Sequence, residues 1–199
     1  MRILVVGGGG SGVGKTTLIC RLIEVLPGWA AIKVSPVHGA VAGGGALDHG
    51  LVGPYRIDAI ERGGSASDTA RLRAAGADPV LWIRSRPSRL GDALSEALSR
   101  LAGAPGVIIE GNSAARHLEA ISVVLVARWG RRDVKPSAAA LARRADWVVL
   151  NRPAPKAAPR PALRVPRRRK SGPFVVDAAR PTDPGTVAFL DAIRAWARR

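Results

Sequence analysis

Short apolar runs alternate with segments of helical periodicity along most of the chain. The runs occupy positions 2–6, 31–34, 80–84, 107–110, 122–127, 147–150 and 173–176, and each has the length of a buried strand. Apolar residues at positions 18, 19, 22, 23 and 26 recur with the spacing of one helix face. Residues 68–75 and 88–102 also read as helices, and Phe189, Leu190, Ile193 and Trp196 form the apolar stripe of a last helix.

Strands that alternate with helices, without hairpin signals between them, predict a parallel sheet with helices on both faces. We therefore expect a three-layer α/β fold with a mostly parallel sheet of about seven strands. The length of 199 residues, with 47% hydrophobic residues, suits one domain over 1–199. Residues 35–65 are glycine-rich with little periodicity, and we expect mobile, ligand-responsive loops there.

The most specific motif follows the first predicted strand and precedes the first predicted helix. Residues 9–16 match the G-x-x-x-x-G-K-T phosphate-binding loop, and this context predicts a P-loop NTPase fold. Its glycines let successive backbone N–H groups face one anion, to which the first helical turn adds unpaired donors. Lys15 is expected to contact the β and γ phosphates, and Thr16 to ligate Mg²⁺. The predicted nucleotide-binding residues of this segment are Gly9, Gly10, Ser11, Gly12, Val13, Gly14, Lys15, Thr16 and Thr17.

Polar residues stand where several predicted strands end, at the edge where parallel sheets bind ligands. They are Lys33, Glu110, Arg128 and Asn151. Glu110 is predicted to be catalytic, either holding Mg²⁺ through water or orienting the nucleophile, and the alternative is a local turn contact. Asp68 is a second catalytic candidate, whose alternative role is to cap the helix that follows it.

Charge and composition point to anionic partners. The chain has 31 Lys and Arg residues against 15 Asp and Glu residues, a formal charge of +16. Seven of these basic residues lie in a Pro-rich segment, 153–173, expected to be a mobile surface loop. No apolar stretch has the length of a membrane span or a secretory signal, so we expect a cytoplasmic protein. The single Cys20 excludes an internal disulfide, and the scattered histidines predict no structural metal site.

Several pieces in order resemble one known family. The phosphate loop, Lys33, residues 68–77 (Asp-Thr-Ala-Arg-Leu-Arg-Ala-Ala-Gly-Ala) and Glu110-Gly111 are similar to the molybdopterin-guanine dinucleotide biosynthesis protein B family, over about residues 1–150. Members of that family are GTP-binding accessory proteins that hydrolyse GTP weakly and are commonly dimeric. They assist the enzyme that attaches GMP to molybdenum-bound molybdopterin. The resemblance implies a slow GTPase using GTP and Mg²⁺, a homodimer, and a molybdopterin nucleotidyltransferase or molybdopterin-bearing protein as partner.

The identity of the base is open in the sequence. Residues 151–154, Asn-Arg-Pro-Ala, keep the asparagine and a basic residue of the guanine-reading Asn-Lys-x-Asp motif but lack its aspartate. GTP is expected from the resemblance, and ATP is the alternative. Asn151 is accordingly either a base contact or an ordinary turn residue.

Three other functions compete with this one. A small-molecule kinase would use Arg71 and Arg73 to clamp an acceptor phosphate and residues 153–173 as an arginine-rich lid, and Lys33 is a further candidate contact to a substrate or partner. A partition or maturation ATPase is disfavoured because Gly10 occupies the position of its extra lysine. A nucleotide-dependent binding module for an anionic partner, including nucleic acid, fits the charge, but no aromatic residue interleaves the basic run.

Overall fold

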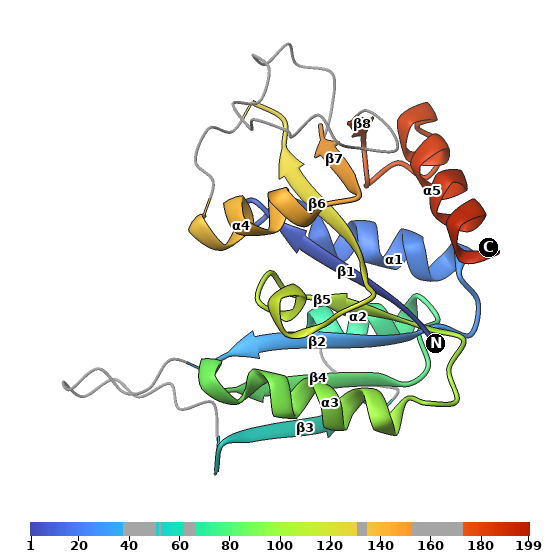
Figure 1. Ribbon diagram of the computed structural model, residues 1–199. Coiled ribbons are helices and arrows are strands. Elements are labelled where there is room, and N and C mark those ends of the chain that lie inside the picture. The colour runs from blue at the N-terminus through green and yellow to red at the C-terminus, as the bar shows by residue number, and fades with distance from the viewer. Residues whose placement is uncertain (38–50, 52, 62–66, 131–134, 153–172) are drawn as a thin grey trace.

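The computed structural model describes residues 1–37, 51, 53–61, 67–130, 135–152 and 173–199. They form one eight-stranded sheet with helices on both faces, which confirms the predicted α/β class (Figure 1). The strands are β1 (Arg2–Gly8), β2 (Ala30–Pro36), β3 (Tyr55–Ala59), β4 (Val80–Ser85), β5 (Gly106–Glu110), β6 (Ser122–Arg128), β7 (Trp147–Asn151) and β8 (Phe174–Val176). Their order is β3-β4-β2-β5-β1-β6-β7-β8, so β1, which leads into the phosphate loop, lies near the centre.

The sheet is parallel except at one edge, where β3 pairs antiparallel with β4. This strand is a correction, because it falls within the segment 35–65 expected to be loops. Its residues alternate, with Tyr55 and Ile57 packed against the core and Arg56 and Asp58 at the alternate positions. Such a short, half-exposed edge strand has too few apolar residues to stand out in the sequence. The rest of that expectation at 38–50, 52 and 62–65 lies outside the described residues.

Two separate cores place the helices on opposite faces of the sheet. One core joins the sheet to α1 (Lys15–Val25), α2 (Asp68–Ala74) and α5 (Pro184–Ala197). The other joins it to α3 (Leu90–Arg100) and α4 (Pro136–Arg144), near the single turns η1 (Pro87–Arg89) and η2 (Ala114–His117) (Figure 1). The sheet between these two helical layers gives the three-layer architecture.

The predicted helices match the structure, but α4 was not predicted. It buries only Ala138, Leu141 and Ala142, so its apolar stripe is weak. In α5, by contrast, Phe189, Leu190 and Ile193 are buried as the stripe predicts. Cys20 is only partly buried, and its thiol lies 3.6 Å from the Arg71 carbonyl oxygen.

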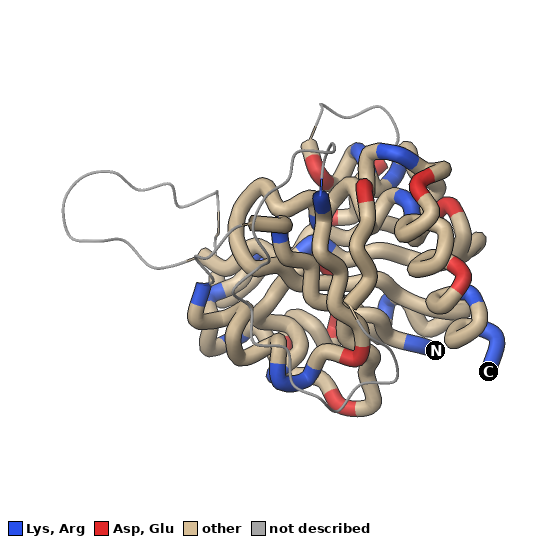
Figure 2. Tube along the Cα trace, turned by 90° about the horizontal axis from the view of Figure 1, so that it is seen from above, with Lys and Arg blue, Asp and Glu red and all other residues tan. Residues whose placement is uncertain are grey.

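Basic and acidic residues are interspersed over the part of the chain that the structure describes (Figure 2). Of the basic segment predicted at 153–173, only residue 173 belongs to this part, so the segment's expected mobility lies outside the described residues. Among the described helices, none combines the length and the apolar character needed to cross a bilayer.

Candidate functional site

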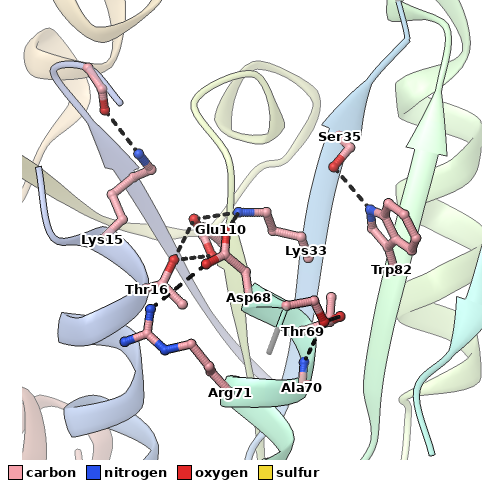
Figure 3. Close-up of polar contacts among 12 residues, drawn as sticks. Lys15, Thr16, Lys33, Ser35, Asp68, Thr69, Ala70, Arg71, Trp82 and Glu110 are labelled. Carbon is pink, nitrogen blue, oxygen red and sulfur yellow. Dashed lines mark hydrogen bonds and ion pairs between the residues drawn. The ribbon is translucent and has the colours of Figure 1, made fainter. Parts of the chain in front are cut away.

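Strand register brings together two charged residues that the sequence placed at strand ends. Lys33 on β2 is the register partner of Glu110 on β5, so both side chains project from the same face of the sheet. The Lys33 ammonium lies 2.7 Å from Glu110 Oε1 and 2.9 Å from Asp68 Oδ2, at the start of α2 (Figure 3). One lysine therefore bridges both predicted catalytic carboxylates.

The first turn of α1 adds a hydroxyl to this cluster. Thr16 Oγ1 lies 3.3 Å and 3.4 Å from the two oxygens of Glu110, to which it donates (Figure 3). The Glu110 side chain is only 2% exposed, and a buried carboxylate needs such hydrogen-bonding and charged partners. The contacts connect the phosphate loop directly to the carboxylate at the end of β5.

The contacts within this cluster shift the pKa values of Lys33 and Asp68. Burial lowers the pKa of Lys33, but the charge of Glu110 and the hydrogen bonds to both carboxylates outweigh it, so the pKa lies above its ordinary value. Burial raises the pKa of Asp68, but the bond and charge of Lys33 leave it below its usual range. Lys33 and Asp68 therefore form an ion pair at neutral pH.

The loop conformation exposes an anion site at the beginning of α1. Gly14 precedes the helix with φ of 92°, and a Cβ there would meet the Asn151 amide nitrogen at 2.2 Å, so only glycine fits. No side chain caps this helix, whose first backbone bond runs from Leu18 N to Gly14 O. The amides of the turn before it point along the helix axis with the positive end of its dipole.

Two loop residues make contacts within the chain. Lys15 Nζ donates to the Gly10 carbonyl at 3.1 Å, so the ammonium lies over the loop that it is predicted to serve. Burial lowers the pKa of Lys15, while Glu110 acts to raise it. The Gly9 amide donates to Val126 O at 2.9 Å, so this N–H is used within the sheet, and nucleotide binding at Gly9 stays a prediction. Gly9 anchors the start of the loop in the sheet.

Asn151 makes two hydrogen bonds within the chain. Its Nδ2 donates to Val13 O at 3.0 Å, and its Oδ1 accepts from Ala178 N at 3.1 Å. The side chain is therefore occupied on both sides and braces the phosphate loop against the region after β8. These two bonds show a structural role for Asn151, and contact with the base stays a prediction.

The two arginines of α2 separate in space. Arg71 Nη2 donates to Thr17 Oγ1 at 3.1 Å, which brings this guanidinium to the phosphate loop. Arg73 instead donates to the Ala77 carbonyl at 2.8 Å and pairs with Asp78, so the structure does not bring it to the site. Residues two positions apart on a helix point in different directions, so membership of one sequence motif did not place both arginines at the site.

Two other predicted roles are corrected. The cap of α2 is Ser67, whose side chain accepts from Ala70 N at 3.3 Å, so Asp68 is left to pair with Lys33. Arg128, at the end of β6, is exposed and is not among the residues lining either cavity beside the loop.

Cavities open on both sides of the phosphate loop. The first, of about 450 Å³, is lined by loop residues together with Lys33, Asp68, Arg71 and Glu110. The second, of about 590 Å³, lies toward α3 and α4 and includes residues that the sequence analysis missed, namely Asn112, Arg116, Lys135 and Ser137. Asn112 directly follows Glu110-Gly111. This position just beyond a strand end was the one feature of the sequence that could have marked it as a site residue.

The first cavity suits Mg²⁺ in the presence of phosphate. Thr16 and Glu110 supply the hydroxyl and carboxylate oxygens that Mg²⁺ prefers. Within the described residues, no group of three or more His, Cys, Asp or Glu side chains could hold a metal alone. The site thus fits an ion that takes its remaining ligands from phosphates and water, as Mg²⁺ does in nucleotide complexes.

Comparison of the chain with protein-family models, curated proteins and solved structures gives no match. The residues and geometry of the site, with the order of motifs in the sequence, therefore carry the functional inference.

Proposed function

We propose that this protein is a P-loop nucleotide-binding protein that binds GTP with Mg²⁺ and hydrolyses it slowly. The convergence of Thr16 with the buried Glu110 beside a G-x-x-x-x-G-K-T loop is the observation that carries the proposal. This arrangement puts anion donors, a metal-binding hydroxyl and a carboxylate at the edge of the sheet where α/β proteins bind ligands.

The residues divide the work by their chemistry. The amides at the start of α1 and the Lys15 ammonium hold the phosphates. Thr16 and Glu110 are the residues that would hold Mg²⁺, Thr16 through its hydroxyl and Glu110 through water, and Glu110 would also orient the attacking water. When bound, Mg²⁺ would supply positive charge beside the phosphate oxygens. Lys33 holds the Glu110 carboxylate in place and is itself paired with Asp68.

The cellular role that we propose follows the family resemblance. The chain would assist molybdopterin guanine dinucleotide synthesis in the cytoplasm as a homodimer, in contact with a molybdopterin nucleotidyltransferase or a molybdopterin-bearing protein. The support is the motif order from the phosphate loop through Lys33 and residues 68–77 to Glu110-Gly111. GTP is preferred to ATP only because of the family resemblance. Asn151 is engaged within the chain and gives no evidence for either base.

A small-molecule kinase is the second candidate. It is favoured by Arg71, which lines the first cavity, and by the second cavity next to the loop, where an acceptor would have room. Arg73 gives this function no support because it pairs with Asp78.

Calorimetric titration with GTP and with ATP, each with and without MgCl₂, tests nucleotide binding. We expect Mg²⁺-dependent binding that is tighter for GTP, and slow release of inorganic phosphate under single-turnover conditions. Failure of both nucleotides to bind contradicts the proposal. Rapid phosphorylation of a small acceptor without free phosphate release favours the kinase instead.

The proposed partner needs a separate measurement. The purified protein is titrated with a molybdopterin nucleotidyltransferase at two salt concentrations, in the presence of GTP and MgCl₂. We expect binding that persists at the higher salt, because a shaped interface loses less affinity than attraction driven by a charge of +16. Binding that disappears with salt, or equal binding to any acidic protein, contradicts the partner assignment.

A further inference from the structure

The second cavity is a preformed pocket at the carboxyl ends of three strands. Gly8 of β1, Val34 of β2 and Asn112 beyond β5 line it, and Ser137 lines it from the first turn of α4. Its volume of about 590 Å³ lies within the range of small-molecule sites. It faces the α3 and α4 side of the sheet, whereas Lys33 and Glu110 face the α1 and α2 side.

The two cavities differ in charge. Among the described residues that line the second cavity, the charged ones are Lys15, Arg116 and Lys135, all basic. The first cavity instead contains both Asp68 and Glu110. Three cations without a carboxylate favour an anion, whereas carboxylates beside basic groups favour a metal with its phosphates.

One wall of the second cavity is apolar and stiff. Its apolar lining residues are Val34 and Pro36 from the end of β2, Pro87 of η1 and Leu90 at the start of α3. Proline and branched side chains have little conformational freedom to lose on binding. This wall can pack against the apolar body of a small organic ligand, whereas a free inorganic ion would make no favourable contact with it.

The polar floor is held in place before any ligand binds. Asn112 Oδ1 accepts from Gly8 N at 2.7 Å, and its Nδ2 donates to Gly8 O at 3.0 Å and to Ser137 Oγ at 3.1 Å. Because the Ser137 oxygen accepts from Asn112, its own hydrogen is available for donation to a ligand oxygen. The floor therefore adds a neutral donor to the three cations.

We propose that this cavity is a second binding site, specific for a small organic phosphate with an apolar body. The phosphate contacts Arg116 and Lys135, with Ser137 as a further donor, and the apolar body packs on the wall formed by Val34, Pro36, Pro87 and Leu90. Ser11 and Lys15 line both cavities, so the ligand lies next to the proposed nucleotide phosphates. Only this adjacency rests on the proposed function, since the cavity itself needs no nucleotide.

Phenyl phosphate is a suitable probe because it joins an aromatic ring to a phosphate. Its affinity is measured by calorimetry without nucleotide for the wild type, Arg116→Met, Lys135→Met and the double variant. Methionine keeps an unbranched apolar stem and removes the charge. Each single change is expected to weaken binding about tenfold, and the double change more, as for lost charge-assisted hydrogen bonds.

Three controls make the result specific. Arg100→Met removes an exposed arginine of α3 that pairs with Glu96, and it should leave phenyl phosphate affinity unchanged. Benzyl alcohol, which lacks the phosphate, should bind at least tenfold more weakly than phenyl phosphate. Thermal melting checks that every variant is folded, which is expected because Arg116 and Lys135 are exposed.

The proposal is overturned if the double variant binds phenyl phosphate as tightly as the wild type, or if benzyl alcohol binds equally well. GTP affinity is measured on the same samples. Retained GTP binding in the double variant, together with lost phenyl phosphate binding, supports two separate sites. Absence of GTP binding in the wild type counts against the proposed function and leaves the phenyl phosphate comparison valid.

Discussion

The Lys33 ammonium lies 2.7 Å from Glu110 Oε1 and so supplies the positive charge beside a carboxylate that is only 2% exposed. It also lies 2.9 Å from Asp68 Oδ2, so a built-in cation stands between the two acidic groups of the site. A divalent ion arriving with a nucleotide meets carboxylates that are already partly neutralised. Lys33 thereby holds the Glu110 carboxylate in position before any metal binds.

Lys33→Met tests this arrangement. Removing the lysine leaves Glu110 buried without its cation, so the free energy of unfolding without Mg²⁺ should fall by about 3 kcal/mol. MgCl₂ should then raise the melting temperature of the variant more than that of the wild type, because the metal replaces the lost charge. Arg194→Met, which breaks the exposed pair with Asp191, is the control and should change neither quantity appreciably. An equal response to MgCl₂ in variant and wild type contradicts the arrangement.

Glu110→Gln separates catalysis from binding. We expect the rate of GTP hydrolysis to fall at least 100-fold, because the amide is a poor proton acceptor and a weaker partner for metal-bound water. Mg²⁺–GTP affinity should fall much less, since the loop donors and Lys15 remain. Glu96→Gln, which alters a carboxylate bound to Tyr55 on the far edge of the sheet, should leave hydrolysis intact. Equal losses of rate and affinity would assign Glu110 a structural role.

Lys15→Met tests the phosphate loop itself. The change removes the ammonium proposed to contact the β and γ phosphates, and GTP affinity should fall about 100-fold. Because this side chain hydrogen-bonds only the Gly10 carbonyl among the residues that the structure describes, the melting temperature should change little. Arg21→Met removes a cation from the same helix, paired there with Glu24, and should bind GTP normally. Retained affinity in Lys15→Met would place the nucleotide elsewhere.

Asn151→Ala distinguishes a brace from a base contact. The change leaves Val13 O and Ala178 N without their partner, and should lower the free energy of unfolding by about 1–3 kcal/mol. A loosened loop should weaken GTP and ATP by the same factor. Calorimetry with both nucleotides provides an internal control, since a loss confined to GTP would show that Asn151 reads guanine.

Asp183 gives the fold a pH-dependent cap on α5. Its Oδ2 accepts from Thr186 N at 2.9 Å and Asp177 N at 3.1 Å. Burial raises the pKa of Asp183, but these hydrogen bonds outweigh it and hold the pKa below its ordinary value. Because the folded-state pKa is the lower one, the stabilisation is complete above the unfolded value, about 3.9, and is lost as pH falls through the folded value.

Asp183→Ala should therefore cost about 1 kcal/mol at pH 7 and less in acid. Urea unfolding of variant and wild type at pH 7 and at about pH 2.5 measures the difference. The gap between the two proteins should narrow at the lower pH. A gap of the same size at both pH values would mean that the charge of Asp183 contributes nothing to the cap.

Much of the architecture follows from local patterns. The first strand, the glycine loop and the helix that begins at Lys15 are contiguous, so their order alone predicts how they lie. Glu110 was predicted as a site residue because parallel strands bring their carboxyl ends to one edge. By contrast, β3 and α4 escaped prediction because each buries only a few small or half-exposed side chains.

Local pattern also assigned some side chains to the wrong place. Arg71 and Arg73 belong to one motif, yet only Arg71 reaches Thr17, because a two-residue step turns a side chain away around the helix. Asn151 stands at a strand end like Glu110, yet its amide is used by Val13 and Ala178. Which partners a polar group meets depends on neighbouring elements that its own segment does not specify.

The sequence by itself determined the alternation of strands and helices, the phosphate loop and the edge of the sheet where charged residues gather. Only the tertiary structure decided that Lys33 meets Glu110 across 77 positions, Thr16 meets Glu110 across 94, and Asn112 meets Gly8 across 104. The reason is physical: hydrophobic periodicity acts over a few residues and sets each element, whereas strand order and register join residues far apart. The second cavity, formed where three such strands end beside α4, therefore had no signature in any one segment.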